Sequence, residues 1–270
     1  MTLLTALAAQ HADRGRERLL AAILCGDVQV DGAVVRDPHL RIPTAARVVL
    51  EPPARLASRG AVKLQRALDA FRLDVAGLTV LDAGAAAGGF TDCLLRNGAD
   101  LVFSVDVAYG MLSYALRQDP RTVVLERTNA MRLEPAQLRP TPDLAVCDLS
   151  FRSLRGVAAH LLALTLRRRL VALVKPQFEW LKPPPTFAGV VDDANDVAAI
   201  METLFVDLER DGLGVEACVA SPIAGRRGNR EAFILLGPRP SETASDGQDV
   251  PEPSQRPAAF LASLRGRADA

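Results

Sequence analysis

The stretch VLDAGAAAGGFTD, residues 80–92, decides how this chain is interpreted. An apolar run ends at Asp82, and Gly84, Gly88 and Gly89 then lead into a helical pattern. Glycines at such a point let the backbone approach a ligand closely, and open α/β sheets bind ligands at the carboxyl ends of their strands. The spacing differs from the Gly-x-Gly-x-x-Gly of dinucleotide-binding loops, and no Gly-Lys-Ser/Thr follows as in a P-loop. The stretch therefore predicts a ligand-binding loop without phosphate ligands.

A second acidic residue follows about one strand–helix unit later. Asp106 stands at the end of the next apolar run, FSVD, where a carboxylate can hydrogen-bond both hydroxyls of a ribose. An acid, a glycine-rich loop and another acid, with no phosphate ligands between them, indicate a nucleoside-type cofactor such as S-adenosylmethionine. The alternative is a plain strand–helix turn followed by a solvated aspartate.

Further along the chain, apolar strands alternate with helical patterns. Helices are predicted at residues 58–75 and 193–211. Strands are predicted at residues 79–83, 101–107, 122–126, 144–149, 170–175, 214–220 and 232–237. Alternation of this kind is typical of a parallel sheet with helices on both faces. The expected fold is therefore α/β and Rossmann-like, with a mainly parallel sheet of seven strands.

The regions on either side of this core have a different character. Residues 1–50 predict a small α+β module, with a helix in RERLLAAILCGD and a hairpin in VQVDGAVV that turns at Asp31-Gly32. A linker is expected at 51–57, and the main domain at 58–237. Residues 238–270 are rich in Pro, Ser, Gly and charged side chains, which predicts a disordered tail apart from a helical turn around Phe260–Leu264.

The composition argues against several classes of protein. No apolar run reaches the roughly 18 residues of a membrane-spanning helix, and the first residues lack the basic region and cleavage site of a signal peptide. The four cysteines are widely spaced and only three histidines are present, so we expect no metal site. Isolated, buried thiols fit a reducing compartment, and we expect a cytoplasmic protein.

A second group of polar residues follows from the predicted strands. Asp148 ends the fourth strand and Lys175 ends the fifth, so both lie on the ligand-binding edge of a parallel sheet. Lys63 lies in the helix before the first strand, and Glu231 begins the last one. Only three of the 32 basic residues are lysines: Lys63, Lys175 and Lys182. Each of these charges, taken alone, is better explained as a solvated side chain at the end of an element.

Together these segments resemble a known family. The motifs that carry the resemblance are Ser58-Arg59-Gly60-Ala61-Val62-Lys63-Leu64, Asp82-x-Gly84 with Gly88-Gly89-Phe90-Thr91-Asp92, Val105-Asp106-Val107-x-Tyr109-Gly110, Arg117-Gln118-Asp119-Pro120-Arg121, Glu126-Arg127-Thr128-Asn129, Asp148-Leu149-Ser150-Phe151, Val174-Lys175-Pro176-Gln177-Phe178-Glu179 and Gly228-Asn229-x-Glu231. In order and in register, over residues 2–237, they resemble the TlyA (hemolysin A) family. Its members are similar to FtsJ-type ribose 2′-O-methyltransferases with an S4 RNA-binding domain in front.

The resemblance implies an activity and a site. It implies a catalytic tetrad of Lys63, Asp148, Lys175 and Glu231, with S-adenosylmethionine as methyl donor. It also implies that the cofactor is bound by Asp82, Gly84, Ala85, Gly88, Gly89, Phe90, Asp106, Val107, Asn129 and Asp148. The implied partner is ribosomal RNA or a ribosomal subunit, methylated at a cytidine ribose, and neither DNA nor a membrane.

Arginines are the candidate contacts to the RNA phosphates. The first set is Arg14, Arg16, Arg18 and Arg59, and further candidates are Arg152, Arg155 and Arg167–Arg169. The chain departs from the family pattern at Ala86-Ala87, where a Ser-Thr pair is usual, and at Asp192, where a basic residue is usual. These departures keep a second hypothesis open, a non-catalytic RNA-binding protein with a degenerate methyltransferase domain. A membrane-lytic protein is less favoured, because no export signal or amphipathic membrane helix is evident. A dehydrogenase is less favoured still, given the spacing of the glycine loop.

Overall fold

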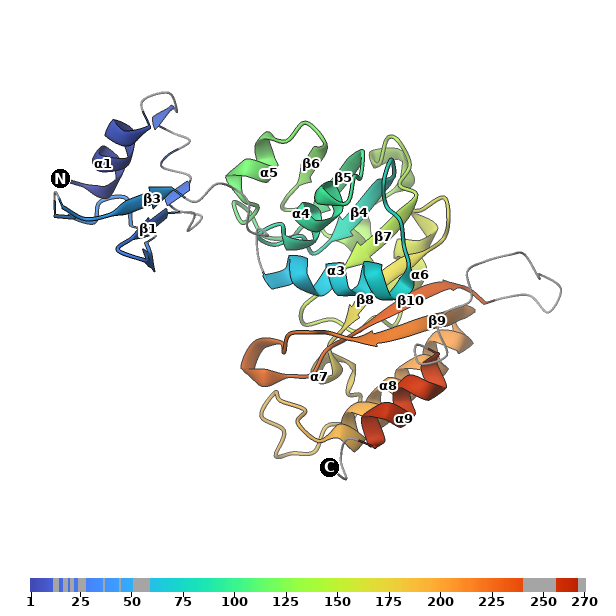
Figure 1. Ribbon diagram of the computed structural model, residues 1–270. Coiled ribbons are helices and arrows are strands. Elements are labelled where there is room, and N and C mark those ends of the chain that lie inside the picture. The colour runs from blue at the N-terminus through green and yellow to red at the C-terminus, as the bar shows by residue number, and fades with distance from the viewer. Residues whose placement is uncertain are drawn as a thin grey trace.

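A computed structural model gives the fold (Figure 1). It describes residues 1–11, 15–16, 19, 22–23, 28–35, 37–43, 45–50, 59–239 and 256–266, without the side chains of Val34, Arg59 and Arg226. The N-terminal elements are α1 (Leu3–Gln10), β1 (Val28–Val30), β2 (Ala33–Val34) and β3 (Val48–Leu50). The main domain contains α3 (Arg59–Phe71), β4 (Thr79–Ala83), α4 (Gly89–Arg96), β5 (Leu101–Val105), α5 (Tyr114–Gln118), β6 (Thr122–Leu125), η1 (Ala130–Arg132), η2 (Pro135–Gln137), β7 (Leu144–Cys147), α6 (Val157–Ala163), β8 (Leu170–Val174), α7 (Pro176–Glu179), α8 (Ala194–Arg210), β9 (Leu213–Ala220), η3 (Arg226–Gly228), β10 (Ala232–Pro238) and α9 (Pro257–Arg265).

The main domain is built on a seven-stranded sheet with the order β6-β5-β4-β7-β8-β10-β9. Its first five strands in this order pair in parallel, and β10 is antiparallel to both of its neighbours, β8 and β9. The predicted seven-stranded, mainly parallel α/β fold is confirmed. The chain leaves β4 towards β5 on one side and reaches β7 on the other, so the topological switch point lies at the carboxyl end of β4.

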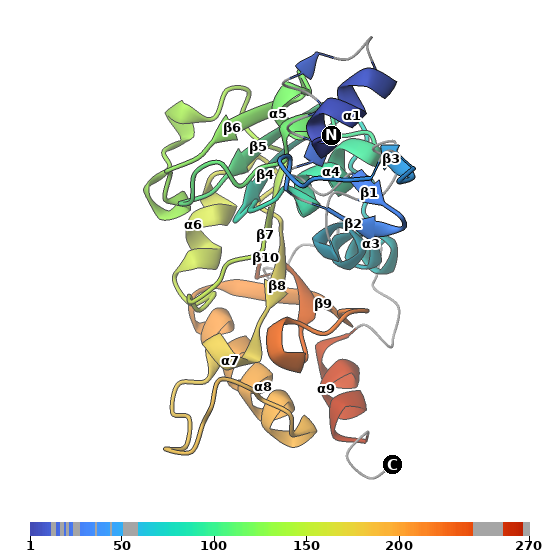
Figure 2. The ribbon, with the colours of Figure 1, turned by 90° about the vertical axis from the view of Figure 1, so that its left-hand side faces the viewer.

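Two hydrophobic layers cover the sheet. Side chains that alternate along β4 divide between them, with Val80 packing in one layer and Leu81 in the other. Helices α3 and α4 supply the first layer, and α6, α8 and α9 supply the second. Figure 2 shows α8 and α9 side by side at the end of the domain where β9 and β10 lie. The strands are therefore buried on both faces, which explains their continuous apolar runs.

The predicted strands stop sooner than expected at their carboxyl ends. The second and fourth strands of the domain end at Val105 and Cys147, so Asp106 and Asp148 come just after the last paired residues. Lys175 likewise follows the end of β8 and caps the start of α7. The polar residues thus leave the sheet ladder and become available at its edge. The helix predicted at 58–75 ends at Phe71, because Arg72 adopts a left-handed conformation (φ 50°).

The N-terminal module forms a small sheet with the order β2-β1-β3. The hairpin predicted at Asp31-Gly32 is confirmed, because β1 and β2 pair in antiparallel register around it. The helix predicted in RERLLAAILCGD is described only at Arg16, Leu19, Ala22 and Ile23, which are helical. Sequence analysis did not predict α1 or β3. Leu3 and Leu7 of α1 are fully buried against the sheet, so the initial apolar run is a core helix.

The helical turn predicted around Phe260–Leu264 is confirmed, and the prediction of a disordered tail is wrong for the other residues of Pro257–Arg265. This segment forms α9 and extends the helical turn expected around Phe260–Leu264 in both directions. Its residues Phe260, Leu261 and Leu264 are buried in the layer that also contains α8. Burial of this apolar stripe stabilises a helix that the polar composition of the surrounding tail conceals.

None of the helices in the part of the chain that the structure describes combines the length and apolar character needed to span a bilayer.

Candidate active site

The loop after β4 is curled tightly against two neighbouring strands. The amides of Gly84 and Ala85 both donate to the carbonyl of Val105, over 2.8 and 3.1 Å. Gly84 has φ +92°, and a Cβ there would lie 2.5 Å from the carbonyl oxygen of Asp148. Only glycine fits this close approach, which brings the loop from β4 against the end of β7.

Asp106 holds the outer part of the same loop. Its carboxylate accepts hydrogen bonds from the amides of Ala86 (2.9 Å) and Ala108 (2.8 Å). The carboxylate is partly exposed and keeps lone pairs for a further donor. Because Ala86 is tied through its backbone, with φ +47°, the Ala86-Ala87 departure leaves this loop attachment intact.

Asp82 is a buried acid beneath the loop. One carboxylate oxygen accepts a 2.7 Å hydrogen bond from the hydroxyl of Thr91 in α4, and Thr91 is 2.8 Å from the hydroxyl of Ser104. The other oxygen has no hydrogen-bond partner among the described residues. Burial raises the pKa of Asp82 to about 7, with a smaller contribution from the nearby Asp148 carboxylate.

The four residues predicted as a tetrad form two lysine–carboxylate pairs. Lys63 of α3 is ion-paired with Glu231, and both side chains are almost completely buried. Lys175 is ion-paired with Asp148 and also donates to the hydroxyl of Ser150 over 3.1 Å. Strand order explains the second pair, because β7 and β8 are parallel neighbours and both residues follow their ends. The antiparallel β10 brings Glu231 to this same edge, since the residue precedes the strand.

One pocket connects the glycine loop with both pairs. It has a volume of about 320 Å³ and is formed by α3, the loop after β4, the end of β7 and the β9–β10 turn. Its lining residues are Gly60, Lys63, Gly84, Ala85, Ala86, Ala87, Gly89, Phe90, Asp148, Ala224 and Gly225. A member of each ion pair therefore faces the space beside the loop.

Other predicted cofactor residues lie in different surroundings. Gly88 has φ +94°, and a Cβ there would overlap the side chain of Leu116, so this glycine serves the packing of α4. Phe90 lines the pocket, but its ring packs in the core against Phe233, 5.9 Å away between centroids. Val107 is 70% exposed, and the exposed Asn129 caps η1 by accepting from the amide of Met131.

The predicted RNA-binding arginines are only partly described. Arg14 and Arg18 lie outside the described residues, Arg16 is exposed, and Arg59 begins α3. Arg152, Arg167 and Arg168 are exposed, and Arg167 is paired with Asp143 and Arg169 with Glu216. Asp192 is exposed immediately before the helix cap at Asp193.

The proposal of Arg155 as a phosphate contact is wrong for this structure. Its guanidinium is largely buried and forms ion pairs with Glu179 (3.0 Å) and Asp207 (2.7 Å). The pairs use Nε and Nη1, while Nη2 is buried without a partner among the described residues. The pairs join the segment before α6 to α7 and α8.

Sequence analysis missed two residues that hold the site's loops. Glu126 accepts from the amides of Gly110, Met111 and Leu112 and pairs with Arg117, which lowers its pKa to about 2. It thereby fixes the segment that follows Asp106. The motif Glu126-Arg127-Thr128-Asn129 contained this residue without revealing its role.

The second residue that sequence analysis missed is Asn229. Its side chain accepts from the amide of Val191 (2.9 Å) and donates to the carbonyl of Gly189 (3.0 Å). The amide of Gly225 donates to the carbonyl of Asn229 over 2.8 Å. These bonds fasten the turn that carries Glu231 to the loop before α8.

Comparison with known proteins places this arrangement among methyltransferases. Residues 56–238 match the model of the family described as FtsJ-like methyltransferase. The chain is 43% identical over 230 residues to "16S/23S rRNA (cytidine-2'-O)-methyltransferase TlyA" of Mycobacterium tuberculosis, covering 83% of this chain and 84% of the relative. It is 31% identical over 226 residues to "Hemolysin A" of Brachyspira hyodysenteriae, covering 80% and 91%.

A solved structure extends the likeness to the whole chain. The protein named "Putative hemolysin from Streptococcus thermophilus" superposes with a TM-score of 0.69 at 30% sequence identity. The match covers 100% of this chain and 98% of the other.

Proposed function

The chain belongs to the FtsJ-like methyltransferase family, and from this premise we propose that it transfers a methyl group from S-adenosylmethionine to a ribose 2′-hydroxyl of ribosomal RNA. The observation that carries the proposal is the presence of two lysine–carboxylate pairs, one buried and one partly buried, beside one glycine-lined pocket. A hydroxyl acceptor needs a group that can receive its proton and fixed charges that orient it. The pocket edge supplies both kinds of group.

The pocket, together with Asp106 beside its loop, fits S-adenosylmethionine. Asp106 has a partly exposed carboxylate for ribose hydroxyls, and the curled loop at Gly84 lets the backbone come close to a ligand. The unpartnered oxygen of Asp82 is buried beneath the loop, outside the pocket lining. The bound cofactor supplies a methyl group on a positively charged sulfur, so the leaving group is neutral.

The chain's own residues then have separate tasks. Lys175 is proposed to orient the 2′-hydroxyl and, in its neutral form, after its ammonium has released a proton to solvent, to accept the hydroxyl proton as the methyl group is transferred. Asp148 and the hydroxyl of Ser150 fix the direction of the Lys175 amine. Lys63 and Glu231 form the second fixed pair and help align the acceptor, since reacting atoms must be held in line to react quickly. Arginine in place of Lys175 could not receive the proton, because guanidinium stays charged in proteins.

Ribosomal RNA is the proposed acceptor because the Mycobacterium tuberculosis relative is named for that substrate and for cytidine 2′-O-methylation. An acceptor 2′-hydroxyl is present in RNA and absent from DNA. The proposal includes a cytidine ribose within a ribosomal subunit, in the cytoplasm, as the target. The two pairs are complete in this chain, which favours an enzyme over a non-catalytic RNA-binding module.

Labelled methyl donor, free ribosomal RNA and isolated ribosomal subunits together test the proposal. We expect label in RNA, and mapping of the modified nucleotide should locate it on a ribose 2′-oxygen. Cofactor binding without any methyl transfer to RNA would support the non-catalytic hypothesis. Leakage of liposomes at low protein concentration, without methyl transfer, would instead support a membrane-lytic protein.

A further inference from the structure

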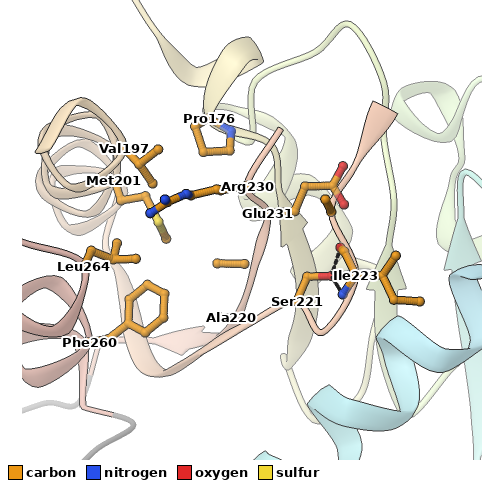
Figure 3. A pocket seen from close by; sticks show the side chains of 12 residues that line it. Pro176, Val197, Met201, Ala220, Ser221, Ile223, Arg230, Glu231, Phe260 and Leu264 are labelled. Carbon is orange, nitrogen blue, oxygen red and sulfur yellow. Dashed lines mark hydrogen bonds between the residues drawn. The ribbon is translucent and has the colours of Figure 1, made fainter. Parts of the chain in front are cut away.

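A second pocket lies directly behind the catalytic pairs. It has a volume of about 320 Å³ and lies between α8, α9 and the turn that joins β9 to β10 (Figure 3). Its apolar walls include Val197, Met201, Phe260 and Leu264. The opposite wall contains Glu231, so this space begins where the tetrad ends.

The second pocket adjoins the cofactor pocket. Ala224 lines both spaces, and Pro176 in the second pocket is the residue after Lys175. Figure 3 shows Pro176 and Glu231 on the side of the pocket away from Leu264 and Phe260. A chain-like substrate whose reacting atom lies at the tetrad could therefore extend its neighbouring unit into this space.

Arg230 gives the pocket a positive charge. The side chain is exposed, and among the described residues it takes part in no ion pair. In Figure 3 its guanidinium extends toward Met201 and Val197, while the adjacent Glu231 carboxylate points the other way. An apolar space with a cationic group at its wall is complementary to a ligand with a flat apolar body and an anionic group.

We propose that this second pocket holds the base of the RNA nucleotide next to the methylated one, with Arg230 on the adjoining phosphate. The inference rests on the proposed function and adds to it a determinant of the target sequence. Bases of single-stranded RNA that are turned out of a stack bind against apolar and aromatic side chains. Here Phe260 and Leu264 line the space and keep a small exposed fraction, whereas Met201 is fully buried.

The first test fills the pocket. Ala220 lines it and is exposed, so Ala220→Phe adds a ring without displacing a buried side chain. With a short RNA that contains the methylation site, we expect KM to rise by about tenfold, the value of one stacked base, while kcat changes little. Ala199→Phe is the matched control, because Ala199 is an exposed alanine of α8 in a different hollow beside Trp180.

The substrate provides the complementary change. Removing the base on either side of the target nucleotide, one position at a time, should raise the wild-type KM by a similar factor at one of the two positions. The same removal should have no further effect on Ala220→Phe, because the pocket is then already closed. Equal KM values for the wild type and Ala220→Phe with intact RNA would overturn the proposal while the methyltransferase function stands.

The charge is tested separately. Arg230→Gln should weaken RNA binding and reduce its dependence on salt concentration by about one ion. Arg210→Gln, at an exposed arginine of α8, is the control. It is expected to leave the RNA affinity and its dependence on salt concentration unchanged. If the wild type methylates no RNA, the proposed function fails. Binding of a labelled random RNA oligonucleotide then decides the inference, since Arg230→Gln and Ala220→Phe must each still weaken it, and unchanged binding overturns it.

Discussion

Glu231 at the start of β10 forms a buried ion pair with Lys63 of α3, a residue 168 positions earlier in the chain. The pair joins the helix that precedes the first strand of the domain to the strand that completes its sheet. It is therefore both a part of the candidate active site and a long-range contact of the fold.

The buried pair predicts an asymmetric response to substitution. Glu231→Gln leaves the Lys63 charge buried without its partner, and we expect the free energy of unfolding to fall by about 3–5 kcal/mol. Replacing both residues by Met and Leu should cost less than either single change. Chemical denaturation measures these values. The control is Arg265→Met, which removes an exposed pair with Glu202 and should cost about 1 kcal/mol or less. Equal losses for Glu231→Gln and this control would contradict the expectation.

The variant Lys175→Arg tests whether Lys175 accepts the proton of the 2′-hydroxyl. The substitution keeps a positive charge beside Asp148, but a guanidinium does not release or accept a proton under these conditions. We expect single-turnover methyl transfer to fall by about 100-fold or more, with cofactor affinity by calorimetry preserved. A rate near that of the wild type would show that charge alone suffices at this position.

The buried Asp82 predicts a pH dependence of stability. Its pKa rises from 3.8 to about 7 on folding, so between these values the native state binds more protons than the unfolded state. Stability therefore falls as pH rises through this window, by about 4 kcal/mol in total. Asp82→Asn lacks this titration. Compared with the wild type, the variant should gain relative stability from pH 4 to pH 7 and no more above it. If the free energies of unfolding of the wild type and Asp82→Asn changed with pH in parallel over this range, the assignment would be contradicted.

Two glycines separate backbone strain from steric overlap. Gly77 and Gly84 both have positive φ, but a Cβ at Gly77 meets nothing within 4 Å, whereas one at Gly84 meets the Asp148 carbonyl. Gly77→Ala should cost about 1–2 kcal/mol. Gly84→Ala should cost more and should also lower methyl transfer, because it displaces the residue that holds Lys175. Unfolding measurements and turnover assays check the two effects, and equal stability losses would argue against the close approach.

The C-terminal helix predicts that the tail contributes to stability. Leu261 of α9 is buried against the layer that contains α8, and Leu261→Ala should lower the free energy of unfolding by about 2–4 kcal/mol. Leu166→Ala removes a leucine that is 67% exposed and should change stability by about 0.5 kcal/mol or less. Thermal and denaturant unfolding give both values. No loss with Leu261→Ala would mean that α9 is not docked in solution.

The strands and their polar ends could be predicted from sequence because each apolar run stops where a charged residue appears. Asp106, Asp148 and Lys175 all follow the last paired residue of a parallel strand. Their meeting at one edge is then a property of parallel sheets. The pairing of Lys175 with Asp148 also needs β7 and β8 to be neighbours, and this strand order cannot be predicted from the sequence.

Other features depend on tertiary contacts that no local pattern records. The run that forms α1 is short and apolar, and only packing on the small sheet shows it to be a core helix. Helix α9 lies in a stretch whose average composition is polar, although its three buried residues provide the stabilising contacts. Arg155 looks like an exposed phosphate ligand in sequence, and its two acidic partners lie 24 and 52 positions away.

The place of β10 in the sheet has a consequence for synthesis of the protein. This strand is inserted between β8 and β9, although both precede it in the chain. A growing polypeptide can assemble the glycine loop, Lys63 and the Lys175–Asp148 pair well before β10 has been made. The gap between β8 and β9 closes only with the last strand, and Glu231 arrives with it. An unfinished chain that stops before Glu231 therefore lacks the Lys63–Glu231 pair.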